Sequence, residues 1–335
     1  MQDAAAGSIA GSGRPRYAYL GPPGTFTEAA LHQVASPDTA DFLPRGDVVA
    51  AVDAVRTGDA DFAVVPIENS VEGGVSATLD TLAAGGGLVV VGEALVPISF
   101  VLAALPGTRL SDVRRISTHP HAWAQCRRSV AALTPGAVHV PATSTAAAAA
   151  RLAEVAAERA GVHEAAEALG FDAVLVAPHS ARSYGLEVLA ADVGDNPSAV
   201  TRFVVVGRPG RIPPRTGADK TTLMVQLPDN EAGALLTMLE QFATRGVNLS
   251  RIESRPIGDE LGRYAFSIDA EGHLEDERVA ATLMGLHRVC PLVLFLGSYP
   301  RADGARTQVH RGTSDAEFAA ARGWVEGLRG DGAPA

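Results

Sequence analysis

The sequence predicts an α/β protein in which a larger catalytic-type region is followed by a small ferredoxin-like domain. Its 335 residues are more than one ordinary hydrophobic core needs, so more than one domain is expected. From residue 16 to about 207, short apolar strands alternate with amphipathic or Ala-rich helices, which is typical of layered α/β folds with mostly parallel sheets. Beyond the Pro-, Gly- and Arg-rich segment 208–220, the order changes to strand–helix–strand–strand–helix–strand, the split βαβ arrangement.

The first region is divided by its apolar runs. Strands are expected at 16–20, 61–67, 87–95, 98–105, 114–119, 137–142, 171–178 and 201–207. Helices are expected at 27–34, 47–57, 77–84, 122–133, 145–160 and 179–184, and the segment 156–170 reads as an extension or a further helix.

The second region has its own pattern. Strands are expected at 221–228, 248–257, 263–271 and 291–300, helices at 233–246 and 274–289, and a turn at 258–262. We therefore expect a flexible leader at 1–15, the catalytic region at 16–208, a linker at 209–219, the small domain at 220–302, and a polar tail at 303–335 with one helix at 314–328.

Composition and charge exclude several classes of protein. A net charge of −10 without a basic block argues against nucleic-acid binding. The apolar stretch 94–107 contains Pro97 and is short for a bilayer crossing, so no membrane association is expected. Cys126 and Cys290 lack CxxC spacing, which favours two reduced, buried thiols. The start of the chain lacks the layout of a signal peptide, and we expect a cytoplasmic protein.

Hydroxyl and amide side chains follow several predicted strands, where helices begin. The junctions are "LGPPGTFTEAA", "VVPIENSVEGG", "STHPHAWAQC" and "ATSTAAAAA". Any one of these side chains is compatible with simple helix capping. Such junctions gather at the carboxyl ends of strands in open α/β sheets, where helix N-termini favour anions. The pattern predicts a small carboxylate or phosphate ligand, and the absence of GxGxxG and Walker sequences disfavours nucleotides.

Thr201 and Arg202 begin the strand that follows the last of these helices. One interpretation is that both side chains face the same cleft as the junction residues. The alternative is that Thr201 hydrogen-bonds to the backbone and Arg202 forms an ion pair on the surface.

Together these segments resemble the prephenate dehydratase family. The ordered matches are "GPPGTFTEAA", "PIENSVEGG", "HPHAWAQC", "STAAAA", "YGLEVLA", the triplet Thr201–Phe203, "GALLTML", "ESRP" and "GSYPRA". The resemblance implies two α/β lobes similar to type II periplasmic binding proteins, followed by a regulatory ACT domain that agrees with the ferredoxin-like order. It also implies decarboxylative dehydration of prephenate to phenylpyruvate, without a metal or redox cofactor. The residues before Tyr17 are too few for a fused chorismate mutase, so a monofunctional enzyme is expected.

The resemblance assigns roles to individual side chains. Thr201 would assist departure of the C4 hydroxyl by hydrogen-bond donation or proton relay, and Arg202 would hold a substrate carboxylate or orient Thr201. The substrate dianion would be bound by Gly24, Thr25, Asn69, Ser70, Ser144, Thr145 and Phe203.

Three further residues near this site, His119, His121 and Asn196, receive no firm catalytic role. His119 and His121 are interpreted as loop or packing histidines, although histidine has a suitable pKa for acid catalysis. Family members usually carry an asparagine two residues before the essential threonine, where this chain has Ala199. Asn196 either reaches the site from a remodelled loop or the role is absent.

In the small domain, two segments resemble those that bind phenylalanine where two ACT domains meet. The residues concerned are Gly233, Ala234, Leu235, Asn248, Leu249, Glu253, Ser254, Arg255 and Pro256. From spacing alone, Glu253 and Arg255 share one strand face, and a surface ion pair is the favoured interpretation. Phenylalanine feedback would imply at least a homodimer and favours a homotetramer. The alternatives are an arogenate dehydratase and a cytosolic small-molecule sensor without turnover.

Overall fold

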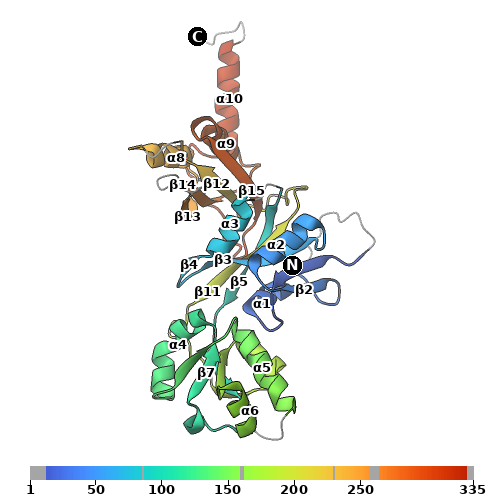
Figure 1. Cartoon of the computed structure of the whole chain (residues 1–335). Coiled ribbons are helices and arrows are strands. Elements are labelled where there is room, and N and C mark those ends of the chain that lie inside the picture. Colours follow the sequence, from blue (N-terminus) through green and yellow to red (C-terminus); the bar gives the residue numbers. More distant parts are fainter. Residues whose placement is uncertain (1–12, 85–86, 159–161, 229–230, 257–263, 330–335) are drawn as a thin grey trace. The chain divides into compact units, whose positions relative to one another are not determined.

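The structure is a computed structural model that describes residues 13–84, 87–158, 162–228, 231–256 and 264–329 (Figure 1). Most of the predicted leader and the predicted turn at 258–262 lie outside these residues. The chain divides into two units. Of the described residues, one unit holds those in 13–78 and 94–203, and the other holds 79–84, 87–93 and those from 204 onward. The division passes through α3 (Ser76–Ala84), β5 (Val89–Pro97) and β11 (Val200–Gly207).

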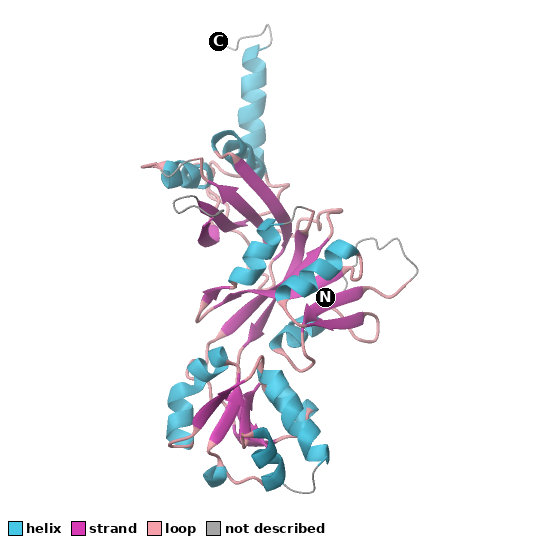
Figure 2. Ribbon diagram, in the orientation of Figure 1, coloured by secondary structure: helices cyan, strands magenta, loops and turns pink. Residues whose placement is uncertain are grey.

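The first lobe is built on a sheet with strand order β2-β1-β3-β11-β5, and the short β4 pairs with β3 (Figure 2). Its remaining elements are β1 (Arg16–Leu20), α1 (Phe26–Val34), β2 (Asp41–Arg45), α2 (Val48–Thr57), β3 (Phe62–Asn69) and β4 (Gly73–Gly74). β1 pairs in parallel with β2 and β3. The parallel pairing places the carboxyl ends of β1, β2 and β3 at one edge of the sheet.

The second lobe has a sheet with strand order β10-β6-β9-β7-β8. Its elements are β6 (Val101–Ala104), β7 (Arg115–Thr118), α4 (Pro120–Leu133), β8 (Val138–Pro141), α5 (Thr145–Glu158), α6 (Val162–Leu169), β9 (Ala173–Val176), α7 (Pro178–Ser183) and β10 (Glu187–Ala190). β7 runs parallel to β8 and β9, whereas β6 runs antiparallel to β9 and β10. This sheet is therefore mixed, and the prediction of mostly parallel pairing does not hold for it.

The predicted strands and helices of both lobes are present, but three strands escaped sequence analysis. β2 contains Pro44 and lies at the sheet edge with every residue at least partly accessible. Proline is tolerated there because an edge strand leaves one row of N–H groups unpaired. β10 is also a largely accessible edge strand, and β4 has only two residues. None of them has the apolar run that identifies a buried strand.

The C-terminal unit contains the predicted ferredoxin-like domain. Its elements are β12 (Asp219–Gln226), α8 (Ala234–Ala243), β13 (Leu249–Pro256), β14 (Tyr264–Glu271), α9 (Glu277–Val289) and β15 (Leu292–Pro300), followed by α10 (Asp315–Arg329). The order β13-β14-β12-β15 is antiparallel throughout, which confirms the predicted βαββαβ arrangement. Leu223, Met238, Phe242, Ile268 and Leu286 form part of its core, which joins the sheet to both helices.

Within the same unit, residues 87–93 pack against the ferredoxin-like sheet. The ammonium group of Lys220 lies 3.1 Å from both carboxylate oxygens of Glu93, and both side chains are almost fully buried. A Cβ atom on Gly297 would collide with the carbonyl oxygen of Val90, so a side chain is not tolerated there without movement of the backbone. None of the described helices is long and apolar enough to span a bilayer.

Candidate active site

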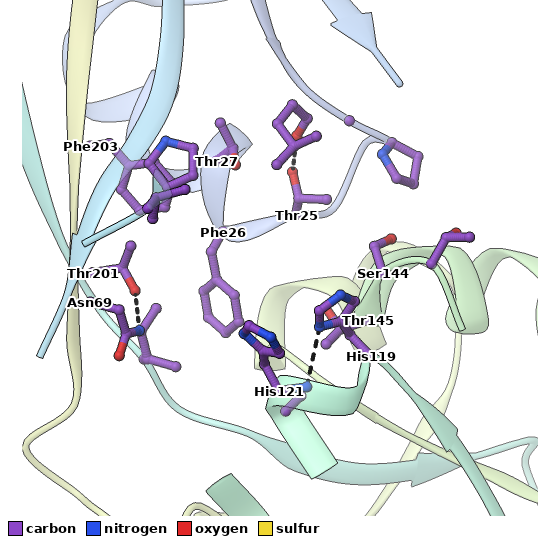
Figure 3. A pocket seen from close by; sticks show the side chains of 18 of the residues that line it. Thr25, Phe26, Thr27, Asn69, His119, His121, Ser144, Thr145, Thr201 and Phe203 are labelled. Atoms are coloured by element: carbon purple, nitrogen blue, oxygen red, sulfur yellow. Dashed lines mark hydrogen bonds between the residues drawn. The ribbon is translucent and has the colours of Figure 1, made fainter. Parts of the chain in front are cut away.

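A cavity of about 620 Å³ lies inside the first unit and is lined by both lobes (Figure 3). From the first lobe, the wall includes residues that follow β1 and β3 and the start of β11, among them Thr25, Asn69 and Thr201. From the second lobe it includes the junctions β7–α4 and β8–α5. The four polar junctions predicted from the sequence therefore meet around one cavity.

Asn69 and Thr201 form a hydrogen-bonded pair in the cavity wall, although they lie 132 residues apart. The Asn69 Oδ1 atom accepts from the backbone N–H groups of Val71 (2.8 Å) and Glu72 (3.2 Å). These bonds fix the amide orientation, so Nδ2 donates to Thr201 Oγ1 at 2.8 Å. This bond uses a lone pair of the Thr201 oxygen and leaves its O–H hydrogen available for a ligand.

Arg202 follows Thr201 in β11 and points to the other face of the strand, as strand geometry requires. Its guanidinium is buried, donates to Glu68 Oε2 at 3.2 Å, and is not among the cavity-lining residues. Ser70 is also outside the lining. Its N–H donates to the Val200 carbonyl (2.9 Å), and its Oγ accepts from the Val200 N–H (3.0 Å). Ser70 thus ties the end of β3 to the start of β11.

The loop before α1 is fixed by capping bonds. Thr25 Oγ1 accepts from the Glu28 N–H (3.3 Å) and donates to the Leu20 carbonyl (3.0 Å). The Gly24 N–H donates to Glu28 Oε2 at 2.6 Å, and Gly24 has a φ of +87°. A Cβ on Gly24 would also lie 3.1 Å from the ring of Tyr184. Gly24 shapes the loop without lining the cavity, whereas Thr25 does both.

The second lobe presents the N-terminus of α5 to the cavity. Ser144 caps this helix, because its Oγ accepts from the Ala147 N–H at 2.9 Å, and Thr145 is the first helical residue. Both line the cavity. Capping and ligand binding are compatible here, since the hydroxyl orders a helix end whose first N–H groups lack intrahelical partners.

Aromatic rings form the apolar part of the wall. Phe26, Phe100 and Phe203 all line the cavity, and the rings of Phe26 and Phe100 pack edge to face with centroids 5.6 Å apart. Asn196 is not among the lining residues. Its Oδ1 accepts from the Ser198 N–H at 3.0 Å, so in this structure it stabilises the turn before β11.

Arg45, at the end of β2, also lines the cavity and was not predicted from the sequence. The reason is that β2 itself was not predicted. Gln125 was missed as well. It lies on α4, one turn beyond His121, and lines the cavity together with Glu72.

His119 and His121, interpreted from the sequence as loop or packing histidines, lie at the junction of β7 and α4 and both line the cavity. His119 caps α4, and its Nδ1 accepts from the His121 N–H at 3.3 Å, which places the proton of a neutral ring on Nε2. Burial, helped by the neighbouring His121 and His139, lowers the pKa of His119, and the nearby Glu72 opposes the shift. His119 is therefore a neutral N–H donor at neutral pH. Because His119 lies in the junction "STHPHAWAQC", its position at the cavity could have been predicted from the sequence.

Comparison with known proteins gives the family. The prephenate dehydratase family model matches residues 17–211, and the ACT domain model matches residues 221–288. The chain belongs to the prephenate dehydratase family. A prephenate dehydratase of Mycolicibacterium vanbaalenii is 46% identical over 328 residues, covering 94% of this chain and 98% of the relative. One from Mycobacterium tuberculosis H37Rv is 44% identical over 301 residues, covering 88% and 89%.

Solved structures agree with this assignment. A prephenate dehydratase from Arthrobacter aurescens in complex with L-Phe is 56% identical, has a TM-score of 0.85, and is matched over 94% of this chain and 100% of its own. A quorum-quenching acylase named GqqA is 32% identical with a TM-score of 0.71, over 85% of this chain and 97% of its own. The same overall fold thus occurs in proteins described by a different chemistry, and the arrangement of side chains in the cavity has to carry the mechanism.

The ACT-domain segments predicted to bind an effector lie at the start of α8 and along β13. Gly233 has a φ of +94° immediately before α8. Glu253 Oε2 lies 3.6 Å from Nη1 of Arg251. The guanidinium of Arg255 donates two hydrogen bonds to the carboxylate of Asp80, at 3.0 and 2.6 Å. Arg255 is thereby connected to α3 within the C-terminal unit. Among the described residues, no group of three or more His, Cys, Asp or Glu side chains is arranged to hold a metal ion.

Proposed function

We propose that this chain converts prephenate to phenylpyruvate in the cavity between its two lobes, with Thr201 as the catalytic donor. In this reaction the bond between the ring and its carboxylate breaks and CO₂ departs. The electron pair enters the ring as the C4–O bond breaks, and the leaving hydroxide takes up a proton to become water. Aromatisation supplies the driving force, so the protein needs to orient the substrate and stabilise the leaving oxygen.

The hydrogen bond from Asn69 to Thr201 carries this proposal. Because the Thr201 oxygen accepts this bond, its O–H is polarised and available to donate to the leaving hydroxyl. A threonine hydroxyl does not ionise near neutral pH, so hydrogen-bond donation or relay of a proton is favoured over transfer from a titrating acid.

Other groups of the cavity suit the two substrate carboxylates. Arg45 adds a positively charged residue to the wall, and the N-termini of α1 and α5 supply backbone N–H groups next to the capping residues Thr25 and Ser144. Thr145 and Phe203 complete the wall around the ring. Arg202, paired with Glu68, is assigned a positioning role behind Thr201, and Ser70 and Gly24 are assigned loop-shaping roles.

Regulation is assigned to the ACT domain. The similar protein from Arthrobacter aurescens was solved with L-Phe, which supports phenylalanine as the effector here. Its site would include Gly233, Ala234, Leu235, Asn248, Leu249, Glu253, Ser254, Arg255 and Pro256. A ligand shared between two such domains requires a homodimer or homotetramer.

We assign residues 16–208 to the catalytic region, 209–219 to the linker, 220–302 to the regulatory domain and 303–335 to the tail. Two free, buried cysteines, Cys126 and Cys290, are consistent with action in the reducing cytoplasm.

The function is tested by incubating the full-length protein with prephenate and, in parallel, with arogenate. Phenylpyruvate is followed by its ultraviolet absorbance in alkali, and phenylalanine by chromatography. We expect turnover of prephenate well above the spontaneous acid-catalysed rate. Preferred turnover of arogenate would reassign the substrate, and turnover of neither would favour a sensor.

A further inference from the structure

Glu72 joins the two lobes through its carboxylate. It lies between β3 and β4 of the first lobe, and both of its oxygens contact α4 of the second lobe. Oε1 accepts a hydrogen bond from Gln125 Nε2 at 2.8 Å, and Oε2 forms an ion pair with His121 Nδ1. His121 and Gln125 are four residues apart and therefore lie one above the other on the same face of α4. A single side chain thus holds two successive turns of the opposite lobe at the cavity wall.

The contact with Glu72 also determines how the amide of Gln125 is oriented. A carboxylate can only accept, so Nε2 of Gln125 must face it and Oε1 must point elsewhere. In the part of the chain that the structure describes, this Oε1 is buried and has no hydrogen-bond partner. A buried acceptor without a partner is unfavourable, and a donor that reached it would remove this cost. Glu72 therefore fixes the orientation of a Gln125 amide whose oxygen has no hydrogen-bond partner among the described residues.

The backbone of Glu72 acts on the other side of the cavity. Its N–H donates to Asn69 Oδ1 at 3.2 Å, and Asn69 in turn donates to Thr201 Oγ1 at 2.8 Å. One residue is thus bonded to the amide that orients the Thr201 donor and to the amide of Gln125. The donor comes from the first lobe and the acceptor from the second, so their separation depends on how the lobes are held.

We propose that Glu72, clamped by His121, is a positioning residue that sets the distance between the lobes and the orientation of the Gln125 amide. This inference rests on the proposed function. A leaving hydroxyl has one oxygen that accepts a bond and one hydrogen that donates a bond, and the pair Thr201 and Gln125 matches both needs. Glu72 does not bind the substrate. Its negative charge would repel a dianion.

The proposal predicts a specific kinetic signature for Glu72→Ala. We expect kcat to fall by about 10- to 100-fold, because displacement of a reacting group by about 1 Å costs rate on this scale. The KM for prephenate should stay constant or fall, because a repulsive charge is removed. Glu72→Gln keeps an acceptor for one of the two contacts and should recover part of kcat. The matched variant His121→Gln retains a donor for Glu72 and should be milder than His121→Leu.

A double-mutant cycle separates positioning from independent binding. If Glu72 acts through Gln125, the variant Glu72→Ala/Gln125→Ala should be no slower than Gln125→Ala alone, since the two residues work as a unit. If the reductions of kcat in the two single variants multiplied in the double variant, the proposal would be wrong. A raised KM with unchanged kcat in Glu72→Ala would also overturn it. Thermal unfolding of each variant shows whether it is folded at the assay temperature.

A readout independent of turnover distinguishes failure of this proposal from failure of the proposed function. Hydrogen exchange of the peptide containing the first two turns of α4 should be faster in Glu72→Ala than in the wild-type chain, with Glu72→Gln in between. Unchanged exchange in Glu72→Ala would show that the carboxylate does not hold the lobes, even if the wild-type enzyme is active. Faster exchange in a chain without prephenate turnover would leave the lobe contact standing and overturn the catalytic reading.

Discussion

Two buried threonines, one in each unit, have the same side chain and opposite hydrogen-bonding states. In the ACT domain, Thr222 Oγ1 donates to Asp269 Oδ1 at 2.7 Å and accepts from the Tyr299 hydroxyl at 2.6 Å. In the catalytic unit, Thr201 accepts from Asn69 and faces a cavity. A hydroxyl with both of its functions engaged inside the fold contributes to stability. One whose donor remains directed at a cavity can contribute to chemistry.

The largest expected effect separates these two threonines. Thr201→Val should lower kcat by about 100- to 1000-fold, the usual loss for one preorganised donor, with little change in thermal stability. Thr222→Val removes one buried hydrogen bond from Asp269 and one from Tyr299, and should lower the free energy of unfolding by about 1–3 kcal/mol with kcat unchanged. Steady-state kinetics and urea unfolding on both variants measure this. Similar kcat values in the two variants would show that Thr201 and Thr222 do not differ in catalytic importance.

The next prediction tests the direction of the Asn69–Thr201 hydrogen bond, in which Asn69 donates. In Asn69→Asp the carboxylate can only accept, so the Thr201 O–H turns toward residue 69 and is lost to the ligand. We expect a loss of kcat approaching that of Thr201→Val. Asn69→Ala removes the polarising bond but leaves the O–H available, and should cost about 10-fold, the scale of one hydrogen bond. If Asn69→Asp were more active than Asn69→Ala, the assigned bond direction would be wrong.

A smaller and separate effect is expected in the regulatory domain. Glu253→Ala should raise the phenylalanine concentration needed for half-maximal response several-fold, about 1 kcal/mol of coupling, while basal turnover is unchanged. Inhibition curves that superimpose on those of the wild-type enzyme would remove Glu253 from the effector site.

The smallest effect concerns pH. Burial lowers the pKa of His119 in the folded chain below its ordinary value of about 6.5, so the unfolded chain binds more protons in that interval. The stability contribution of neutral His119 is therefore complete above about pH 6.5 and is lost as the pH falls toward the folded pKa. His119→Gln should flatten this part of the profile, measured as the free energy of unfolding between pH 5 and pH 7.5 at about half-unit steps. If the free energy of unfolding of the variant depended on pH as steeply as that of the wild-type chain, groups other than His119 would be responsible.

The ferredoxin-like domain was predictable from the sequence because its elements are local and periodic. The core residues of β12, α8 and α9 recur at strand and helix spacings, and the structure confirms their order. Thr201 and Asn69 were recognised as site candidates by resemblance, but their bond joins residues 132 positions apart and no local pattern encodes it.

The misses have physical causes as well. Arg45 was overlooked because β2 is an accessible edge strand without an apolar run. Glu72 and Gln125 were overlooked because a carboxylate and an amide on accessible segments are ordinary surface residues until the second lobe is placed opposite the first. Arg202 was expected to hold a substrate carboxylate or to orient Thr201, and alternation along β11 places it beside Glu68, away from the cavity lining.

The central claim is that the hydroxyl hydrogen of Thr201 assists the leaving oxygen, and a comparison of kcat/KM between Thr201→Ser and Thr201→Val tests it most directly. Serine keeps the O–H and the acceptor for Asn69, whereas valine keeps the shape and loses both. The account predicts that the serine variant stays within about 10-fold of the wild-type enzyme while the valine variant falls by at least about 100-fold. Equal kcat/KM values in the two variants would contradict it.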